Sequence, residues 1–423
     1  MLTARFANRL PYRSVLQHRN FRLFWFGLVA QVGGQQIFNI TIGWLAYDLS
    51  GSPLTLGIVN LLQSLPRIAL TLLGGALADR WDQRKLIIIA QLASAVLLVA
   101  LAVLALTDSI EVWHLGLGAL LLGFVHSFDE PSRQSLFPHL LPTRDLIAQA
   151  VPLNTLAWQT NRILAPTLAG FLIAATGAGT SFFVAASGAA LMAMMMRIIR
   201  VDRIVHESKG SVLRDVKEGT AYVWNNDVFR AIIAMSLFNS IFAMSYIYMM
   251  PLFAEDVHHV GPTGLGLLYS ASGIGTIASL LTASWVRRLV DPGKVILTGF
   301  MAFSVLLMLF AFTPWFPVAL VVLVLLGFAR NAYLMTGEIV LQTYVPDALR
   351  GRVMGLYGLL WSITPLGGFV LNATANFTGA PIALGGGAAL VLAYVLLIGI
   401  RSRSLRGLVL PGDAEATQSA KRG

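Results

Sequence analysis

The sequence predicts an all-α membrane protein with twelve transmembrane helices in two six-helix, pseudo-symmetric halves. Three observations predict it: an apolar composition, apolar runs of spanning length, and basic residues confined to alternate connections. Of 423 residues, 56% are hydrophobic and 12% charged, against about 25% charged in an average soluble domain. We therefore expect a polytopic membrane protein without a soluble enzyme domain. The absence of cysteine excludes disulfides, thiolate catalysis and cysteine metal sites.

A helix needs about 20 apolar residues to cross the hydrocarbon core. The apolar runs of this chain predict spans near 21–49, 54–78, 85–106, 113–137, 148–176, 181–199, 229–253, 264–287, 295–312, 316–344, 350–376 and 381–400.

The spans and their flanks predict five regions of the chain. These are a cytoplasmic N-terminal segment at 1–20, a six-helix half at 21–200, a cytoplasmic linker at 201–227, a second six-helix half at 228–401 and a disordered cytoplasmic tail at 402–423. Apolar residues of the linker, from Val212 to Trp224, recur at helical spacing and predict an amphipathic helix. This helix either lies on the inner membrane surface or serves only as a tether.

Basic residues separate the connections into two sets. The connections at 50–53, 107–112, 177–180, 255–263, 313–315 and 377–380 contain no Lys or Arg, and the alternate connections hold nearly all of them. Under the positive-inside rule this predicts an even number of spans with both termini in the cytoplasm. The net charge of +10 then reflects topology, and no nucleic-acid partner is expected.

The two halves also repeat short motifs. Residues 53–57 (PLTLG) resemble 262–266 (PTGLG), Leu122-Gly123-Phe124 resembles Leu326-Gly327-Phe328, and Gly170-Phe171 resembles Gly368-Phe369. Such a parallel repeat predicts a substrate cavity between the halves near the bilayer midplane, open to each side in turn.

At the connection between spans two and three, the chain resembles the major facilitator superfamily of transporters. The residues that match its signature are Gly75, Leu77, Asp79, Arg80, Arg84 and Lys85, whereas Asp82 stands where the general pattern has glycine. The segments WLAYDLSGSP (44–53), GGALADR (74–80) and GTAYVW (219–224) are similar to the enterobactin-exporter and macrolide-efflux group. The resemblance implies the major facilitator fold, export, a monomer and a bacterial inner membrane.

The signature residues are expected to form a conformational gate at the cytoplasmic ends of the helices. Asp79 would pair with Arg133 or with the N-terminus of span eleven, and Arg80, Arg84 and Lys85 would hold the neighbouring surface. The alternative is that these charges only fix topology and contact anionic lipid.

Span five contains Pro166 and Gly170 in a segment that resembles the glycine-proline motif of drug:proton antiporters. Proline kinks a helix and small residues allow close approach of a neighbour. The resemblance implies export, and plain helix packing is the alternative.

Charges predicted well inside the spans are the candidates for proton coupling and substrate binding, because a charge in the bilayer is costly. They are Arg67, Asp129, Glu130, Arg162, Arg330 and Glu338. Glu130 and Glu338 are the favoured proton carriers; Asp129 is either a third carrier or an ion-pair partner of Arg133. The three arginines either bind an anionic substrate or neutralise these acids, and we favour neutralisation.

Amides on span one add a candidate polar surface. Gln31, Gln35 and Asn39 lie four residues apart and so share one helix face. His258 and His259 beside two acids in an external loop match no established metal spacing, so a solvated loop is favoured.

No glycine-rich phosphate loop is present in the sequence, so we expect an ion gradient to drive transport, without a cofactor. The leading hypothesis is a secondary active transporter that exchanges protons for a hydrophobic or amphipathic small molecule, such as a drug, macrolide or siderophore. Uptake or facilitated diffusion of a small nutrient, a lipid flippase and a non-transporting sensor are the alternatives.

Overall fold

The computed structural model describes the backbone of residues 13–80, 82–201 and 212–408. It describes the side chains of these residues except at 13, 71–80, 144, 212–217, 287–288, 347–348 and 361.

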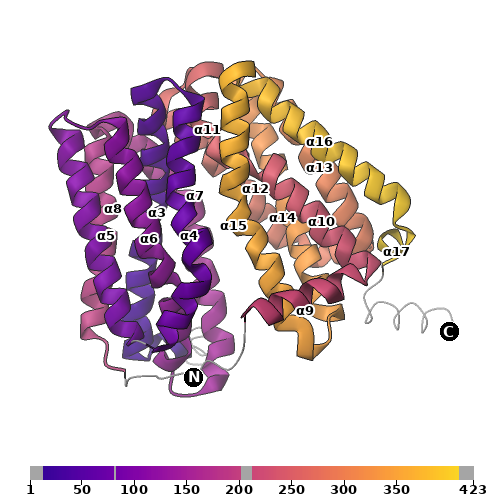
Figure 1. Cartoon of the computed structure of the whole chain (residues 1–423), viewed down its shortest axis with the longest axis horizontal. Coiled ribbons are helices and arrows are strands. Elements are labelled where there is room, and N and C mark those ends of the chain that lie inside the picture. The colour runs from indigo at the N-terminus through magenta and orange to yellow at the C-terminus, as the bar shows by residue number, and fades with distance from the viewer. Residues whose placement is uncertain (1–12, 81, 202–211, 409–423) are drawn as a thin grey trace, which may run out of the picture. The chain divides into compact units, whose positions relative to one another are not determined.

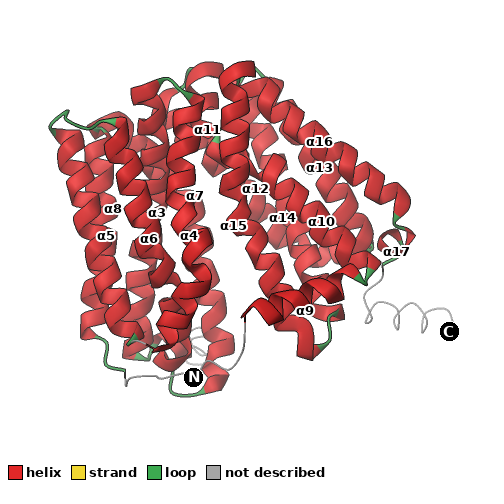
Figure 2. Ribbon diagram, in the orientation of Figure 1, coloured by secondary structure: helices red, strands yellow, loops and turns green. Residues whose placement is uncertain are grey.

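The described residues form helices and connections, with no strand among them (Figure 2). Helices suit a membrane because their backbone hydrogen bonds are satisfied within the segment. Nine helices are long and apolar enough over their described residues to cross a membrane. The helices of 16 residues or more are α3 (Arg19–Ser50), α4 (Pro53–Arg80), α5 (Gln83–Leu106), α6 (Val112–Leu136), α7 (Ile147–Thr176), α8 (Ala178–Ile198), α10 (Asp227–Phe242), α12 (Gly261–Leu289), α13 (Pro292–Phe312), α14 (Phe316–Tyr344), α15 (Asp347–Thr378) and α16 (Ala380–Arg401).

The chain divides into two compact units. Unit 1 comprises Met1–Gly51, Ile58–Lys209 and Gly261–Leu267, and unit 2 comprises Ser52–Gly57, Gly210–Val260 and Leu268–Gly423. In unit 1, α3 packs against α7 and α8, and α5 packs against α6 and α8. In unit 2, α10 packs against α15 and α16, and α13 packs against α14 and α16. The same packing pattern therefore recurs six spans later, which agrees with the predicted pseudo-symmetric fold.

The repeated glycine motifs mark close helix crossings inside each unit. In unit 1, a Cβ on Gly266 of α12 would lie 2.7 Å from the Pro166 carbonyl oxygen, and a Cβ on Gly170 of α7 would meet the Pro262 carbonyl. In unit 2, a Cβ on Gly57 would lie 3.4 Å from the Cα of Phe369 on α15. Glycine is required where two backbones approach this closely.

The predicted seventh span does not continue as one helix. It ends as α-helix at Phe242 and goes on as short segments: η3 (Met244–Tyr248), α11 (Met250–Leu252) and η4 (Phe253–Val257). The Ser245 hydroxyl lies 3.0 Å from the carbonyl oxygens of Ser240 and Ile241 and 2.9 Å from that of Thr364 on α15. These side-chain contacts compete with the regular helical pattern, and Pro251 has no N–H to continue it.

A helix, α9 (Val212–Trp224), forms where the sequence predicts an amphipathic one, and it rests on α15 in unit 2 (Figure 1). Glu218 and Arg352 form an ion pair, with Arg352 Nη1 2.6 Å from Glu218 Oε2. Val223 is 3% exposed, whereas Trp224 is 67% exposed. The ion pair and the buried valine fix α9 to α15, so it is more than a free tether.

The exposed apolar faces have the spacing of lipid-facing helices. On α5, Ile89, Val96 and Val103 lie seven residues apart and are 61%, 69% and 47% exposed, while Ile87 and Leu98 are buried. Two helical turns separate residues seven apart, so one stripe of α5 faces outward.

The α7–α12 crossing gives the first prediction. Gly170→Leu should destabilise the purified protein by about 1–3 kcal/mol, because the added side chain meets backbone atoms that have no room to move. Gly386→Leu on α16 is the matched control, since a Cβ there meets nothing within 4 Å. Thermal unfolding in detergent checks both variants, and equal loss in the two would contradict the proposed crossing.

Candidate functional site

In unit 1, an ion pair joins α4 to α6. Arg67 donates to the Glu130 carboxylate at 2.9 Å, and their side chains are 40% and 41% exposed. Both residues are predicted site residues that the fold brings together.

A second acid on α6 is sealed from solvent. Asp129 accepts from Arg133 Nε at 2.8 Å, with side chains that are 1% and 8% exposed. The two residues are one helical turn apart, so a single helix holds the pair. This geometry supports the alternative that Asp129 is an ion-pair partner. Arg133 is thus bound to an acid of its own helix, α6.

His126 completes the α6 face one turn before these acids. It is 8% exposed, and its buried Nδ1 has no hydrogen-bond partner. Its burial beside Arg67 and Arg133 depends on how α4 packs against α6.

The amide face of α3 is extended by α4. Gln31 Nε2 donates to Gln35 Oε1 at 3.4 Å, and Gln63 Nε2 donates to Asn39 Oδ1 at 2.9 Å. Gln31 Oε1 is buried without a partner. The sequence prediction missed Gln63; its signal is a polar residue inside the apolar run of span two.

In unit 2, Arg330 of α14 is 3% exposed. Its guanidinium donates to Tyr246 Oη at 3.5 Å and to Thr276 Oγ1 of α12 at 3.4 Å, and its Nε has no partner. Tyr246 Oη also lies 3.0 Å from Ser272 Oγ. The sequence prediction missed this hydroxyl cluster, because its members come from η3 and α12.

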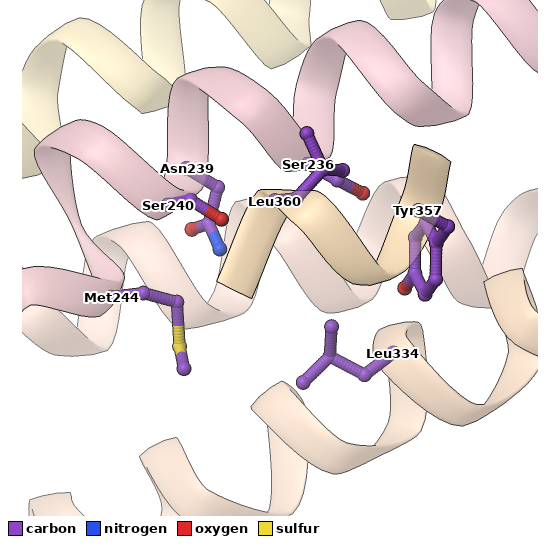
Figure 3. A pocket seen from close by; sticks show the side chains of 7 residues that line it. All are labelled: Ser236, Asn239, Ser240, Met244, Leu334, Tyr357 and Leu360. Carbon is purple, nitrogen blue, oxygen red and sulfur yellow. The ribbon is translucent and has the colours of Figure 1, made fainter. Parts of the chain in front are cut away.

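Unit 2 also contains a small pocket (Figure 3). It is lined by residues of α10, η3, α14 and α15, namely Ser236, Asn239, Ser240, Met244, Leu334, Tyr357 and Leu360. Asn239 Nδ2 donates to Tyr333 Oη at 2.9 Å, and Asn239 Oδ1 is buried without a partner.

Glu338 lies one turn beyond Leu334 on α14. It is exposed, and its carboxylate accepts from Gln342 Nε2 at 3.1 Å. The burial expected for this acid is therefore absent, because its face of α14 is left uncovered. Glu338 is also close enough to Tyr357 of the pocket to interact electrostatically.

The predicted gate is only partly within the described side chains. Gly75, Asp79 and Arg80 lie outside them. Arg84 donates to the backbone carbonyls of Met196 and Arg197 at 2.9 and 2.8 Å, which satisfies the C-terminal end of α8.

Asp82 caps the N-terminus of α5. Its carboxylate accepts from the backbone N–H of Lys85 at 3.1 Å, and the Lys85 ammonium lies 3.9 Å away. This explains an acid at the position where the family pattern has glycine, because Asp is a preferred N-cap residue.

Arg162 is half-buried on α7, one turn before the buried Pro166. In the external loop, the His258 ring packs 6.1 Å from the Phe310 ring and 5.9 Å from the Phe316 ring. This burial lowers the pKa of His258. Among the described residues, no group of three or more His, Cys, Asp or Glu side chains could hold a metal ion.

Comparison with known proteins decides the family. A family model described as "Transmembrane secretion effector" (MFS_3) matches residues 12–416. The chain belongs to this family. The superfamily expected from the signature is thereby confirmed, and this family member is a multi-pass membrane transporter of small molecules and not an enzyme.

Curated relatives of this family member are exporters. It is 25% identical to the multidrug efflux pump Tap of Mycolicibacterium fortuitum, with 84% of this chain and 89% of that protein covered. It is 23% identical to the enterobactin exporter EntS of Citrobacter koseri, with 82% and 80% covered.

Solved structures support the fold alone. The nucleoside transporter NupG is similar with a TM-score of 0.70 at 15% identity, covering 90% of this chain and 98% of that one. A bacterial homologue of the human lysosomal transporter Spinster is similar with a TM-score of 0.68 at 13% identity, covering 93% and 96%.

The two ion pairs of unit 1 should respond differently to neutralisation. Asp129→Asn leaves Arg133 buried beside a neutral amide and should cost about 3–5 kcal/mol of stability, whereas Glu130→Gln removes a half-exposed pair and should cost about 1 kcal/mol or less. Thermal unfolding in detergent measures the difference. The double variant Asp129→Leu/Arg133→Met should recover most of the loss; if it unfolds as early as Asp129→Asn, the burial of an unpaired charge is not the cause.

Proposed function

We propose that this transporter is a proton-coupled exporter of a hydrophobic or amphipathic small molecule, such as a drug, macrolide or siderophore. It works by alternating access, as a monomer in the bilayer of a bacterial inner membrane, with both termini in the cytoplasm. The named activities of the relatives, multidrug efflux and enterobactin export, and the basic residues of alternate connections support this proposal.

The half-exposed Arg67–Glu130 pair carries the proposal of proton coupling. A proton on Glu130 abolishes the negative charge and with it the attraction across α4 and α6. Exposed pairs contribute up to about 1 kcal/mol, which is enough to bias an equilibrium between two conformations several-fold. Proton binding and substrate binding then influence each other reciprocally through that equilibrium.

The other two acids take different places in this scheme. Asp129 is bound to Arg133 and sealed, so its protonation requires α6 to open. Glu338 is exposed and reaches the unit 2 pocket through Tyr357, so it is the second proton carrier. The amides Gln31, Gln35 and Asn39 supply hydrogen bonds to the polar part of a substrate.

We keep the signature residues as the conformational gate. Arg84 anchors the end of α8 inside unit 1, and Gly75, Asp79 and Arg80 have side chains outside the described ones. In span five, Pro166 and the glycine crossing at Gly170 supply the helix kink expected of an exporter.

The test is proton flux in liposomes that contain the purified protein, under an imposed pH gradient, with a panel of drugs, macrolides and siderophores. A transported compound should drive proton movement opposite to its own, and Glu130→Gln or Glu338→Gln should lower the coupled flux at least tenfold, because glutamine cannot load a proton. Glu255→Gln, at an exposed acid of η4, is the control and should keep the parent flux.

Three outcomes separate the alternatives. Compound movement without proton movement favours facilitated diffusion, and proton movement in the same direction favours nutrient uptake. Movement of labelled lipid alone favours a flippase. Normal coupling in both Gln variants would show that neither glutamate carries the proton.

A further inference from the structure

We propose that Arg330 receives the anionic group of the transported molecule. The substrate class is then an amphipathic organic anion with a carboxylate, phosphate or comparable group. This inference rests on the export function proposed above and specifies what is exported.

Arg330 differs from the paired arginines of unit 1. Arg67 and Arg133 each donate to a carboxylate, at 2.9 and 2.8 Å. Among the described side chains, Arg330 has only hydroxyl partners, and both of these hydrogen bonds are long, at 3.4 and 3.5 Å. It therefore does not neutralise Glu338, the acid that lies two turns further along α14 and bonds to Gln342.

The guanidinium of Arg330 is a buried cation without a described counter-charge. A buried charge is strongly disfavoured unless an opposite charge or several good hydrogen bonds compensate it. Here one donor, Nε, has no partner at all and the residue is only 3% exposed. The planar fork of N–H donors matches the two oxygens of a carboxylate or phosphate.

Hydroxyl groups surround the same point. Tyr246 and Thr276 contact the guanidinium, and Ser272 contacts Tyr246. A hydroxyl can donate as readily as it can accept. The cluster can therefore turn its protons toward an incoming anion, which a carboxylate in the same place would repel.

The pocket lies one helical turn from Arg330 along α14. Leu334 is four residues after Arg330 and lines the pocket, and residues four apart lie on one helix face. The cavity volume is about 10 Å³, which is room for about one water molecule. The pocket therefore offers a polar contact beside the ligand of Arg330 and does not enclose a larger group.

The pocket also offers the substrate a hydrogen-bond acceptor. Asn239 points its amide toward the pocket from α10 (Figure 3). Its Nδ2 is committed to Tyr333, whose ring stacks 3.8 Å from Phe300. Its unpartnered Oδ1 is then free to accept from an N–H or O–H close to the group that Arg330 binds.

The experiment compares carboxylates with their isosteric neutral amides. Binding of benzoate, salicylate, 1-naphthylacetate and indole-3-acetate, each against its carboxamide, is measured by tryptophan fluorescence on the purified full-length protein in detergent. We expect at least one carboxylate to bind tenfold or more tightly than its amide. Arg330→Gln should abolish this preference, Arg330→Lys should keep part of it, and Lys294→Gln, at an exposed lysine of α13, should leave it unchanged.

The size-exclusion profile and thermal unfolding of each variant show whether it is folded, and Arg330→Lys keeps the test valid if Arg330→Gln is not. The inference is overturned if, in the parent protein, every carboxylate binds no more tightly than its carboxamide, or if neither member of any pair binds. So does a preference that survives Arg330→Gln, or full displacement of every carboxylate by 100 mM chloride, which would indicate a site for an inorganic counter-ion.

The same preparations separate this inference from the export function. Arg330-dependent binding of carboxylates without proton flux in liposomes would refute proton-coupled export and leave the anion site standing. Proton-coupled export of neutral compounds that is equal in the parent and in Arg330→Gln would refute the anion site and leave the export function standing.

Discussion

Compensation of charge inside the membrane-spanning helices is the constraint on which the functional parts of this transporter depend. The lipid core offers neither water nor counter-ions. Asp129 and Arg133 satisfy the constraint within one turn of α6, and Arg67 and Glu130 satisfy it across two helices. The first pair is buried, whereas the second is half-exposed. Burial, more than the residue types, thus distinguishes the two pairs.

Close backbone contact is the second constraint, and it places these charges. The glycines of the repeated motifs occupy equivalent crossings: Gly170 and Gly266 in unit 1, and Gly57 against α15 in unit 2. Helix association in lipid relies on such packing because apolar surface gains little there.

Much of the fold could be predicted from sequence because hydrophobic length and the positions of Lys and Arg are one-dimensional signals. The span 316–344 agrees with α14 at both ends, and the internal repeat anticipated the recurring packing. The break after Phe242 could not be predicted, since it depends on contact between Ser245 and Thr364 of a distant helix. For the same reason the sequence identified Arg330 but not Ser272 and Thr276 of the hydroxyl cluster around it. Exposure of Glu338 was missed because hydropathy does not tell which helix faces are covered.

The charge of the substrate decides how the membrane potential acts on transport. If a proton enters as an organic anion leaves, each step moves one elementary charge in the direction that a negative interior favours. The potential contributes about 2.3 kcal/mol per charge for each 100 mV. Exchange of one proton for an anion therefore gains roughly twice the electrical driving force of exchange of one proton for a neutral molecule. An uncompensated Arg330 is consistent with this, because its charge stays with the protein while the anion is released. An anion site at Arg330 would thereby let the membrane potential act on both halves of the proposed exchange.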